Sequence, residues 1–386
     1  MSRDLSNGSV SGTGTWSGNI GEWGEVFALM YLLSHNDLYN ADSHGRRIKS
    51  EHGEIRAVYR SETGNVNMTF KVEGDYVDVS RNGVHVATVE KLKFRSKAHT
   101  LFQRMLTQGT TANHPEQEFL KQLGCRSLKA ASTAKADLAA DVYDPYLSSA
   151  TRREYSIKTV VGGAPSLANA SNQSYIDYEL SGFDERKAAL VNGIKGTSWV
   201  VSRTKAVLDL VDAPPKPIIR SDTFRRNLQK CYFRTPEVVG AAVLYGQLNR
   251  GKAVIDSIAE LFGVNPLGLD ESEKEDYEMG IRNYLWGVVF DLDPGRPWRG
   301  QSNVDGYLLV TEDEEVLAYQ VTRVTSFQNY LLLHTKWDTP STSRYKEIGR
   351  VWQRADGTWM YTLNCAVRYT SKEYGGQYSW VVGIND

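Results

Sequence analysis

Two short segments separated by a turn sequence constrain most strongly what this chain can fold into. Residues 135–143 and 153–161 each alternate in the way expected of a strand, and residues 144–149 between them are turn-forming. The pattern predicts an antiparallel hairpin. Side chains two apart on a strand share a face, so closure in the middle of the turn would place Asp137 opposite Lys158.

A carboxylate and an ammonium at one sheet edge suit metal-assisted hydrolysis of a phosphodiester. Aspartate supplies a hard oxygen ligand for Mg²⁺, and lysine can hold or help deprotonate the attacking water while it stabilises charge on the phosphate oxygens. A cross-strand salt bridge with a purely structural role explains the same two residues. This segment alone does not separate the two interpretations.

Composition bounds the class of protein. The chain has 386 residues, enough for two domains, and its 45 Lys and Arg against 46 Asp and Glu exclude a global basic signature for nucleic acid. Its three cysteines are far apart, which argues against a disulfide framework or a zinc site. Without an apolar run typical of a signal peptide or a membrane span, we expect a soluble, cytoplasmic protein.

The N-terminal part predicts a flexible arm followed by a buried helix. Residues 1–19 are rich in Ser and Gly, and Asn19 is an acceptable N-cap for the apolar run that follows. Glu22 is expected to favour the helix start through the helix dipole. Glu25, next to apolar residues, either has the same role or reaches the metal site.

Residues 55–89 alternate with period two and predict a small β-meander, with a hairpin turn at Asn82-Gly83. Residues 97–123 predict a helix broken at Gly109 and a second helix after Pro115. Residues 184–213 are interpreted as helix, strand and helix.

The proline-rich stretch 213–217 is the best boundary candidate, and helices are expected over 236–286. The last hundred residues are predicted to be β-rich around an irregular segment, 327–345. Two groups of polar residues either face DNA or occupy ordinary loops and surface. They are Asn169, Asn172 and Gln173, and Lys336, Thr342, Ser343 and Arg344.

Several separated segments together resemble the HpaII-type restriction endonucleases, a family of the PD-(D/E)XK nuclease superfamily. The segments follow the family's order, and SIK and DTPST are the most distinctive pieces. They are GEWGE at 21–25, KADL at 135–138, SIK at 156–158 with LANAS at 167–171, DGYLLV at 305–310, and FQNYLLLHTKWDTPSTSRY at 327–345.

The resemblance implies an α+β (mixed α/β) fold: a PD-(D/E)XK nuclease core with a mixed central sheet flanked by helices, plus a β-rich C-terminal part. It implies a Mg²⁺-dependent type II restriction endonuclease that cuts both strands of double-stranded DNA at a short palindromic site related to CCGG. A cognate DNA methyltransferase would be its partner in the cell, without a stable complex. For a palindrome a homodimer is the simplest solution, and sequential cutting by a monomer stays open.

Carried over by position, Asp137 matches the metal-binding aspartate and Lys158 the catalytic lysine. Ser156 stands where the superfamily usually has Asp or Glu, so another acidic group must help to neutralise the cation. Glu25 is the first choice, because some nucleases of the superfamily supply a glutamate from a helix. The further candidates are Glu154, on the same face as Ser156, and then Asp141 and Glu179.

We therefore expect a flexible arm over residues 1–19 and a nuclease core over 20–213 that holds the helix, the meander and the catalytic hairpin. Residues 214–386 would form a helical segment followed by a β-rich DNA-recognition part. Two other functions stay open from sequence: a strand-nicking or repair nuclease of the same superfamily, and a sequence-specific DNA-binding protein without catalysis.

Overall fold

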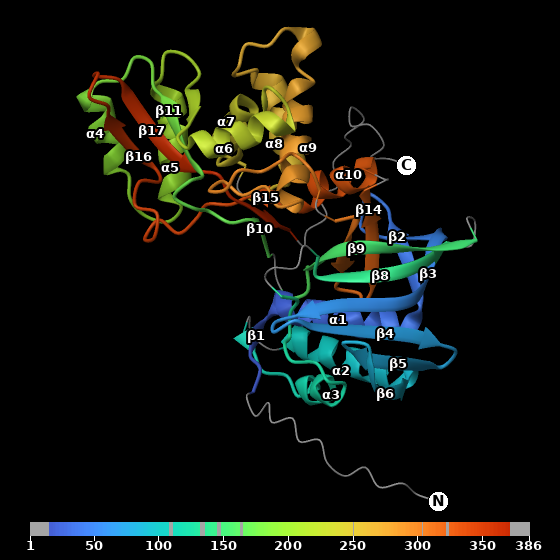
Figure 1. Ribbon diagram of the computed structural model, residues 1–386. Coiled ribbons are helices and arrows are strands. Elements are labelled where there is room, and N and C mark those ends of the chain that lie inside the picture. The colour runs from blue at the N-terminus through green and yellow to red at the C-terminus, as the bar shows by residue number, and fades with distance from the viewer. Residues whose placement is uncertain are drawn as a thin grey trace, which may run out of the picture. The chain divides into compact units, whose positions relative to one another are not determined.

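The computed structural model describes most of the chain as a mixed α+β fold, as predicted (Figure 1). The described residues form two compact units. Unit 1 takes residues up to Asn40, Ile48–Gly162 and Val304–Ala318, and unit 2 takes the remainder. The described ranges are 15–107, 111–131, 136–144, 148–162, 165–249, 251–302, 304–321 and 324–370.

This division differs from the boundary expected after residue 213. The proline-rich stretch leads into strand β12 (Lys216–Ile219), which pairs with β11 (Tyr175–Glu179) inside unit 2. Proline lacks an N–H and is tolerated at such edge positions, so the prolines here mark the edge of a sheet and not a linker. Of the arm expected over residues 1–19, residues 1–14 lie outside the described residues, and β1 (Gly18–Asn19) pairs with β7 (Thr111–Ala112).

Helix α1 (Ile20–His35) begins where the sequence predicts. The Asn19 side chain accepts a hydrogen bond from the Glu22 amide at 3.0 Å, and the Glu22 carboxylate accepts one from the Asn19 amide at 3.0 Å. This reciprocal capping box satisfies two helix-terminal donors. Glu22 therefore stabilises the helix start, as expected, and its other oxygen pairs with Lys129 at 2.7 Å.

The described part of unit 1 contains a nine-stranded sheet that is mixed, with β9–β13 and β2–β14 parallel. An additional pairing of β2 with β3 closes six of the strands into a ring, a closure that the sequence did not predict. In spatial order the strands are β2 (Asp37–Ala41), β14 (Val316–Gln320), β13 (Gly306–Val310), β9 (Ser149–Thr159), β8 (Leu138–Asp144), β3 (Arg47–Glu62), β4 (Val66–Glu73), β5 (Tyr76–Arg81) and β6 (Val84–Glu90).

Strands β3 to β6 are the predicted meander, joined by antiparallel pairing throughout. The turn between β5 and β6 has positive φ at Asn82 (50°) and Gly83 (79°). Two-residue hairpin turns of this kind need positive φ at both central positions, which explains the Asn-Gly signal.

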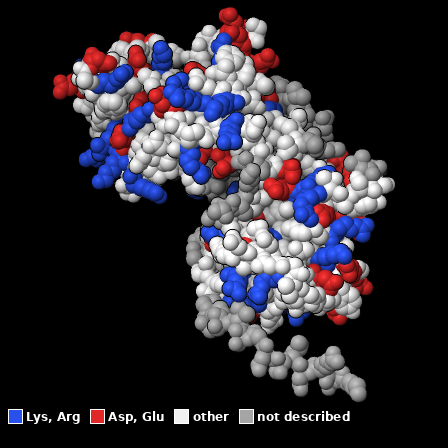
Figure 2. Space-filling view, viewed as in Figure 1, with Lys and Arg blue, Asp and Glu red and all other residues white. Residues whose placement is uncertain are grey.

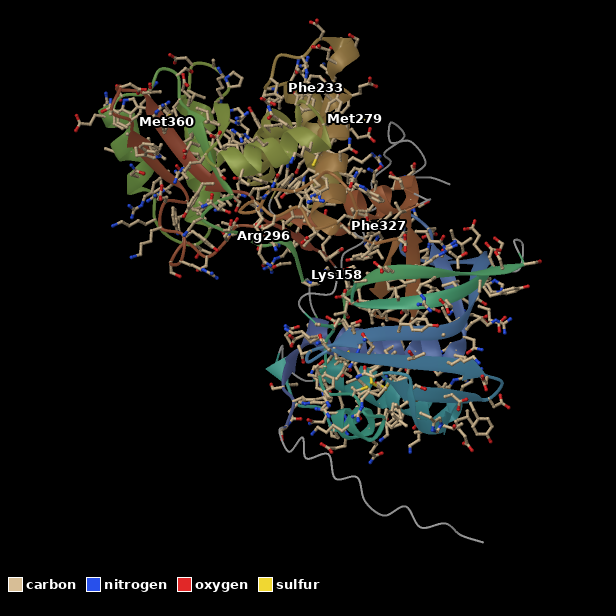
Figure 3. All side chains as sticks on the ribbon, in the orientation of Figure 1. Lys158, Phe233, Met279, Arg296, Phe327 and Met360 are labelled. Atoms are coloured by element: carbon tan, nitrogen blue, oxygen red, sulfur yellow. The ribbon has the colours of Figure 1, made fainter. Side chains whose placement is uncertain are left out.

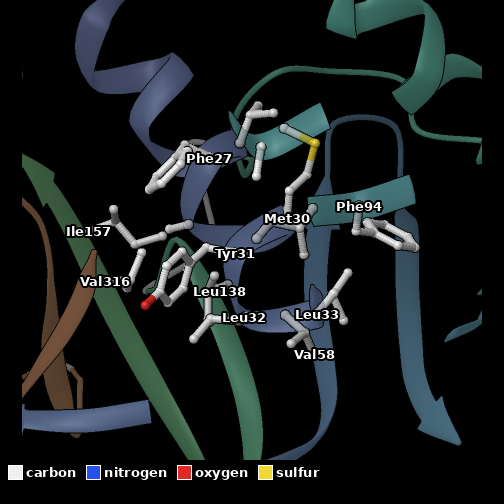
Figure 4. Close-up of a cluster of buried hydrophobic side chains, with 14 of the residues drawn as sticks. Phe27, Met30, Tyr31, Leu32, Leu33, Val58, Phe94, Leu138, Ile157 and Val316 are labelled. Atoms are coloured by element: carbon white, nitrogen blue, oxygen red, sulfur yellow. The ribbon is translucent and has the colours of Figure 1, made fainter. Parts of the chain in front are cut away.

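Helices α1 and α2 (Lys91–Thr107) pack on the sheet and form the core of unit 1 (Figure 4). Phe27 and Met30 of α1 meet Val58, Leu138 and Ile157 of the strands, and none of these side chains is more than 5% exposed. Helix α2 begins six residues before the predicted start, α3 (Glu116–Gln122) follows Pro115 as predicted, and Gly109 lies outside the described residues.

Gly24 sets how closely α1 approaches the hairpin of β8 and β9. A Cβ at Gly24 would lie 2.9 Å from the Cβ of Thr159 in β9, closer than side chains pack. The absence of a side chain therefore lets α1 lie directly on β9. This contact carries Glu25, the next residue, to the hairpin.

The described part of unit 2 combines helices with two small sheets, ordered β12-β11-β17-β16 and β10-β18-β15. The helices are α4 (Glu185–Gly193), α5 (Trp199–Leu210), α6 (Asp222–Cys231), α7 (Thr235–Gly246), α8 (Val254–Val264), α9 (Asp276–Val289), α10 (Val324–His334) and the 3₁₀ turn Glu271–Glu273. The further strands are β10 (Ser166–Ala168), β15 (Thr335–Trp337), β16 (Arg350–Gln353), β17 (Trp359–Asn364) and β18 (Val367–Tyr369).

Two local predictions were wrong in unit 2. No strand separates α4 from α5, because Trp199-Val200-Val201 starts α5 after a left-handed Ser198. Residues 327–334 are helical and not irregular, since the aromatic rings of Tyr330 and His334 stack one turn apart in α10. None of the helices in the described ranges is long and apolar enough to span a membrane.

Candidate active site

The predicted hairpin is present as β8 and β9, but its register differs from the expected one. Leu138 lies opposite Tyr155, and the Asp137 amide donates to the Tyr155 carbonyl at 2.9 Å. Asp137 therefore comes opposite Ser156, and not opposite Lys158. The pairing runs out to Asp144 and Ser149, so the hairpin closes about one residue earlier than a turn centred between residues 147 and 148.

Asp137 is held by two donors from β9. Its Oδ2 accepts a hydrogen bond from the Ser156 hydroxyl at 3.1 Å and one from the Ile157 amide at 2.6 Å. Both donors bind the same oxygen, so neither engages Oδ1. Ser156, where the resemblance led us to expect a carboxylate, thus orients the aspartate and adds no charge to the site.

Lys158 lies on the same face of β9 as Ser156 and is half-buried (Figure 3). Beside it in β13 is Leu309, in parallel register. Glu154 shares this face but is exposed. Its amide donates to the Asp305 carboxylate at 2.8 Å, a bond that fastens the start of β13 to β9.

Glu25 projects from α1 toward this hairpin. One of its oxygens, Oε2, is buried without a hydrogen-bond partner in the described structure. Burial raises the pKa of the Glu25 carboxyl to about 8, and the nearby Asp137 carboxylate adds to the rise, whereas Arg60, the Ala130 amide and Lys158 lower it. A buried carboxylate oxygen left unpaired is costly, which marks this atom as a place for a ligand.

Arg60 and Glu62 of β3 form a fully buried ion pair that sequence reasoning missed. The Arg60 guanidinium donates to the carbonyls of Ser127 at 2.6 Å and Leu128 at 3.2 Å, and Glu62 accepts from the Arg126 amide at 2.6 Å. The pair therefore fixes the loop that supplies the Ala130 amide to Glu25.

A sequence signal for this pair existed. Val58, Arg60 and Glu62 alternate along β3, and all three are buried. Opposite charges two apart on a buried face can bond to one another, and such a pair is seldom left without further polar partners.

The two weaker acidic candidates lie elsewhere. Asp141 already accepts a hydrogen bond from the Tyr59 hydroxyl at 2.7 Å and pairs with Arg152 at 2.9 Å, so its oxygens are engaged. Glu179 is an exposed residue of β11 in unit 2.

The donor set fits a hard divalent cation. Within the described ranges, no group of three or more His, Cys, Asp and Glu side chains could hold a metal ion. Magnesium, however, is commonly bound through one or two carboxylates, with waters and substrate phosphate completing its shell. Glu25, with its unpartnered buried oxygen, and Asp137, with Oδ1 unused by its two donors, fit that smaller requirement.

The residues predicted to face DNA lie in unit 2, where the structure joins two of their segments. Asn169, Asn172 and Gln173 are exposed on the loop between β10 and β11. Tyr345 follows Thr342, Ser343 and Arg344 in the chain. Its hydroxyl donates a hydrogen bond to the Ala170 carbonyl at 2.6 Å. The two polar loops are therefore neighbours.

Lys336 belongs to a strand and not to these loops. In β15 it pairs with Arg368 of β18, which in turn lies beside Ser166 of β10. Arg368 is engaged by Asp338 at 3.0 Å. The three-stranded sheet thus presents Lys336 next to a second cation, and that cation is already paired with a carboxylate.

Comparison with known proteins identifies the family of this chain. A family model described as HpaII restriction endonuclease matches residues 19–369. The type II restriction enzyme HpaII of Haemophilus parainfluenzae is 26% identical over 370 residues, covering 92% of this chain and 99% of that protein. No solved structure matches. Because the family match spans almost the entire chain and includes both halves of the hairpin site, the protein belongs to the HpaII restriction endonuclease family of type II site-specific nucleases.

Proposed function

We propose that this protein hydrolyses phosphodiester bonds of double-stranded DNA at a short specific site with the help of Mg²⁺, using a PD-(D/E)XK-type core in unit 1. One observation carries the proposal. The unpartnered oxygen of Glu25 is buried, and the nearby Asp137 carboxylate is oriented by two hydrogen bonds, while Lys158 is close enough to lower the pKa of the Glu25 carboxyl.

The chain's residues have separate roles in this proposal. Asp137 and Glu25 hold the cation, and Glu154 is the second candidate for the carboxylate that Ser156 does not supply. When bound, Mg²⁺ would polarise the scissile phosphate and make a bound water a better nucleophile. Lys158 holds the attacking water and stabilises charge that develops on the phosphate oxygens.

Unit 2 would supply sequence recognition. The exposed amides of Asn169, Asn172 and Gln173 match the donor and acceptor pairs on base edges in the major groove. Four further residues would hold the backbone or bases: Lys336, Thr342, Ser343 and Arg344. A palindrome related to CCGG is the first site to test, together with a symmetric homodimer and protection of the host site by a cognate methyltransferase.

Digestion of phage DNA of known sequence tests this function. We expect discrete fragments that require Mg²⁺ and share their end sequences, which would give the site and the stagger. Lys158→Ala should abolish cutting but leave DNA binding, whereas Lys71→Ala, which removes an exposed lysine of the same sheet, should cut normally. If the Lys158→Ala protein cuts DNA as well as the Lys71→Ala control, Lys158 has no role in the mechanism.

A further inference from the structure

Unit 2 contains a cavity of about 620 Å³ that is lined by both aromatic and positively charged side chains. Two tryptophans, Trp199 at the start of α5 and Trp352 in β16, line it together with Lys346 and Arg350. Thr342, one of the residues predicted to contact DNA, lines it as well. In Figure 2, Lys and Arg side chains gather over the part of unit 2 that holds α5 and β16.

Trp352 is exposed but fixed in place. Its side chain is 36% exposed, and its Nε1–H donates to the Thr362 hydroxyl at 2.9 Å. Thr362 is fully buried and donates to Asp177 at 2.7 Å, and Asp177 is held by Arg220 at 2.7 Å. The buried Thr362 and Asp177, with the partly exposed Arg220 behind them, thus anchor an indole whose ring still reaches solvent.

Trp199 is held by a different set of contacts. The Arg203 guanidinium lies 4.3 Å from its ring centroid and also donates to the Gly349 carbonyl at 2.9 Å. Gly349 has a positive φ of 71°, and a Cβ there would lie 2.7 Å from the Trp199 ring. Only glycine allows this approach, so the backbone itself supports the second indole.

The charges at the cavity favour an anion. Glu347 lines it, but Arg220 binds that carboxylate at 2.7 Å. In the part of the chain that the structure describes, neither Lys346 nor Arg350 forms an ion pair, and both are exposed. Two rigid aromatic rings beside two uncompensated cations match a nucleotide, whose base stacks on aromatic faces and whose phosphate pairs with cations.

We propose that this cavity binds one nucleotide of a DNA strand, unstacked from its neighbours, with its base against the indoles and its phosphate against Lys346 and Arg350. The proposal rests on the proposed function, because DNA is the substrate there. It adds a contact in which a base leaves the helical stack and is held by aromatic rings, and groove contacts alone would not provide this.

The test uses the full-length protein with Ca²⁺ in place of Mg²⁺, and a duplex carrying the mapped site with 2-aminopurine at one position at a time. We expect the 2-aminopurine fluorescence to rise at one position with wild-type protein and not with Trp352→Ala, whose DNA binding should weaken by about 5- to 100-fold. Lys346→Ala/Arg350→Ala should lower the magnitude of the slope of log K against log salt by about 1, the value for one phosphate contact. Arg186→Ala/Lys205→Ala, which removes two exposed cations outside the cavity, is the matched control.

Three results would overturn the proposal. If the cavity variants bind and fluoresce like the control while wild-type protein still cuts DNA, the cavity has no such role and the proposed function stands. A change in the salt slope with no fluorescence rise at any position would reduce the cavity to a plain phosphate contact. Displacement by free ATP, with DNA binding unaffected, would assign it to a free nucleotide.

Wild-type protein that binds DNA without cutting would instead contradict the proposed function. The cavity would then be judged by the same fluorescence measurement on the retained fragment. The failure of one proposal is therefore distinguishable from the failure of the other.

Discussion

Ser156 controls the orientation of Asp137 through a single hydrogen bond of 3.1 Å. Ser156→Ala removes that donor and leaves only the Ile157 amide on the carboxylate. Residues that orient a metal ligand typically contribute about 10- to 100-fold to metal affinity or activity. We expect a loss of this size in cleavage, and a higher Mg²⁺ concentration for half-maximal rate.

The matched control is Ser149→Ala, at the exposed end of the same strand. Cleavage rates measured across a Mg²⁺ series separate the two variants. A Ser156→Ala enzyme with unchanged Mg²⁺ dependence would show that the Ile157 amide alone orients Asp137.

Glu25 makes the stability of the metal-free protein depend on pH. Burial raises the pKa of the folded protein's Glu25 carboxyl from 4.5 to about 8. The folded state then binds the proton more tightly than the unfolded state, so the stability from this group is complete below about pH 4.5 and is lost as pH rises toward 8. Glu25→Gln removes the charge, so it should raise the free energy of unfolding by a few kcal/mol near pH 8, with about 5 kcal/mol as the upper bound.

Urea unfolding of the wild-type and Glu25→Gln proteins without divalent metal, at several pH values, measures the gap between their free energies of unfolding. It should widen between pH 5 and pH 8 and shrink when Mg²⁺ is added, because a cation binds the ionised carboxylate. Glu118→Gln, at an exposed glutamate of α3, should show no such trend. A gap that is the same at every pH would mean that Glu25 titrates as it does in water.

At the scale of elements, the Arg60 and Glu62 pair ties β3 to the loop before the hairpin of β8 and β9. Arg60→Met leaves the Glu62 carboxylate buried without its partner and frees the carbonyls of Ser127 and Leu128. Removing one partner of a buried ion pair costs about 3–5 kcal/mol. We expect a loss of stability of this size, measured by chemical unfolding.

The double variant Arg60→Met/Glu62→Leu is the control, because it removes both charges of the pair and not only one. It should recover part of the stability, because no uncompensated charge stays buried. Cleavage should stay impaired in both variants, since the loop that carries Ala130 is no longer fastened. Full activity in the double variant would show that the loop needs no such support.

Local signals in the sequence predicted the elements that depend on neighbouring residues. Asn19 and Glu22 marked the start of α1, Asn82-Gly83 marked the turn of the meander, and alternation marked β8 and β9. The hairpin register was wrong because alternation alone does not specify where a turn of several residues closes. The contacts of the Arg60 and Glu62 pair with the loop could not be predicted, because the loop residues lie more than sixty residues away along the chain.

At the scale of the whole molecule, unit 1 is built from three separate stretches of the chain. β9, which carries Ser156 and Lys158, lies between β8 and β13, and β13 comes from residues 306–310. Sequence patterns could not place this late strand, because its pairing is set by packing over more than one hundred residues. The expected boundary after residue 213 therefore cut through the sheet that holds the candidate site.

A fragment ending at residue 213 tests this organisation. It keeps β8 and β9 but lacks β13 and β14, so the core side chains of β9 lose the neighbours Leu308 and Val310. We expect it to unfold without a cooperative transition by circular dichroism, whereas the full-length protein unfolds cooperatively. A fragment with a sharp transition would show that the first 213 residues form a domain of their own.

The late arrival of β13 also has a consequence during synthesis. The ribosome makes β8 and β9 by residue 159, but the strand that completes their sheet emerges only after some 140 further residues of unit 2. A chain that terminates early therefore carries the candidate catalytic residues on an unfinished sheet. We expect such truncated products, which lack β13, to be unable to cut the DNA of the cell that makes them.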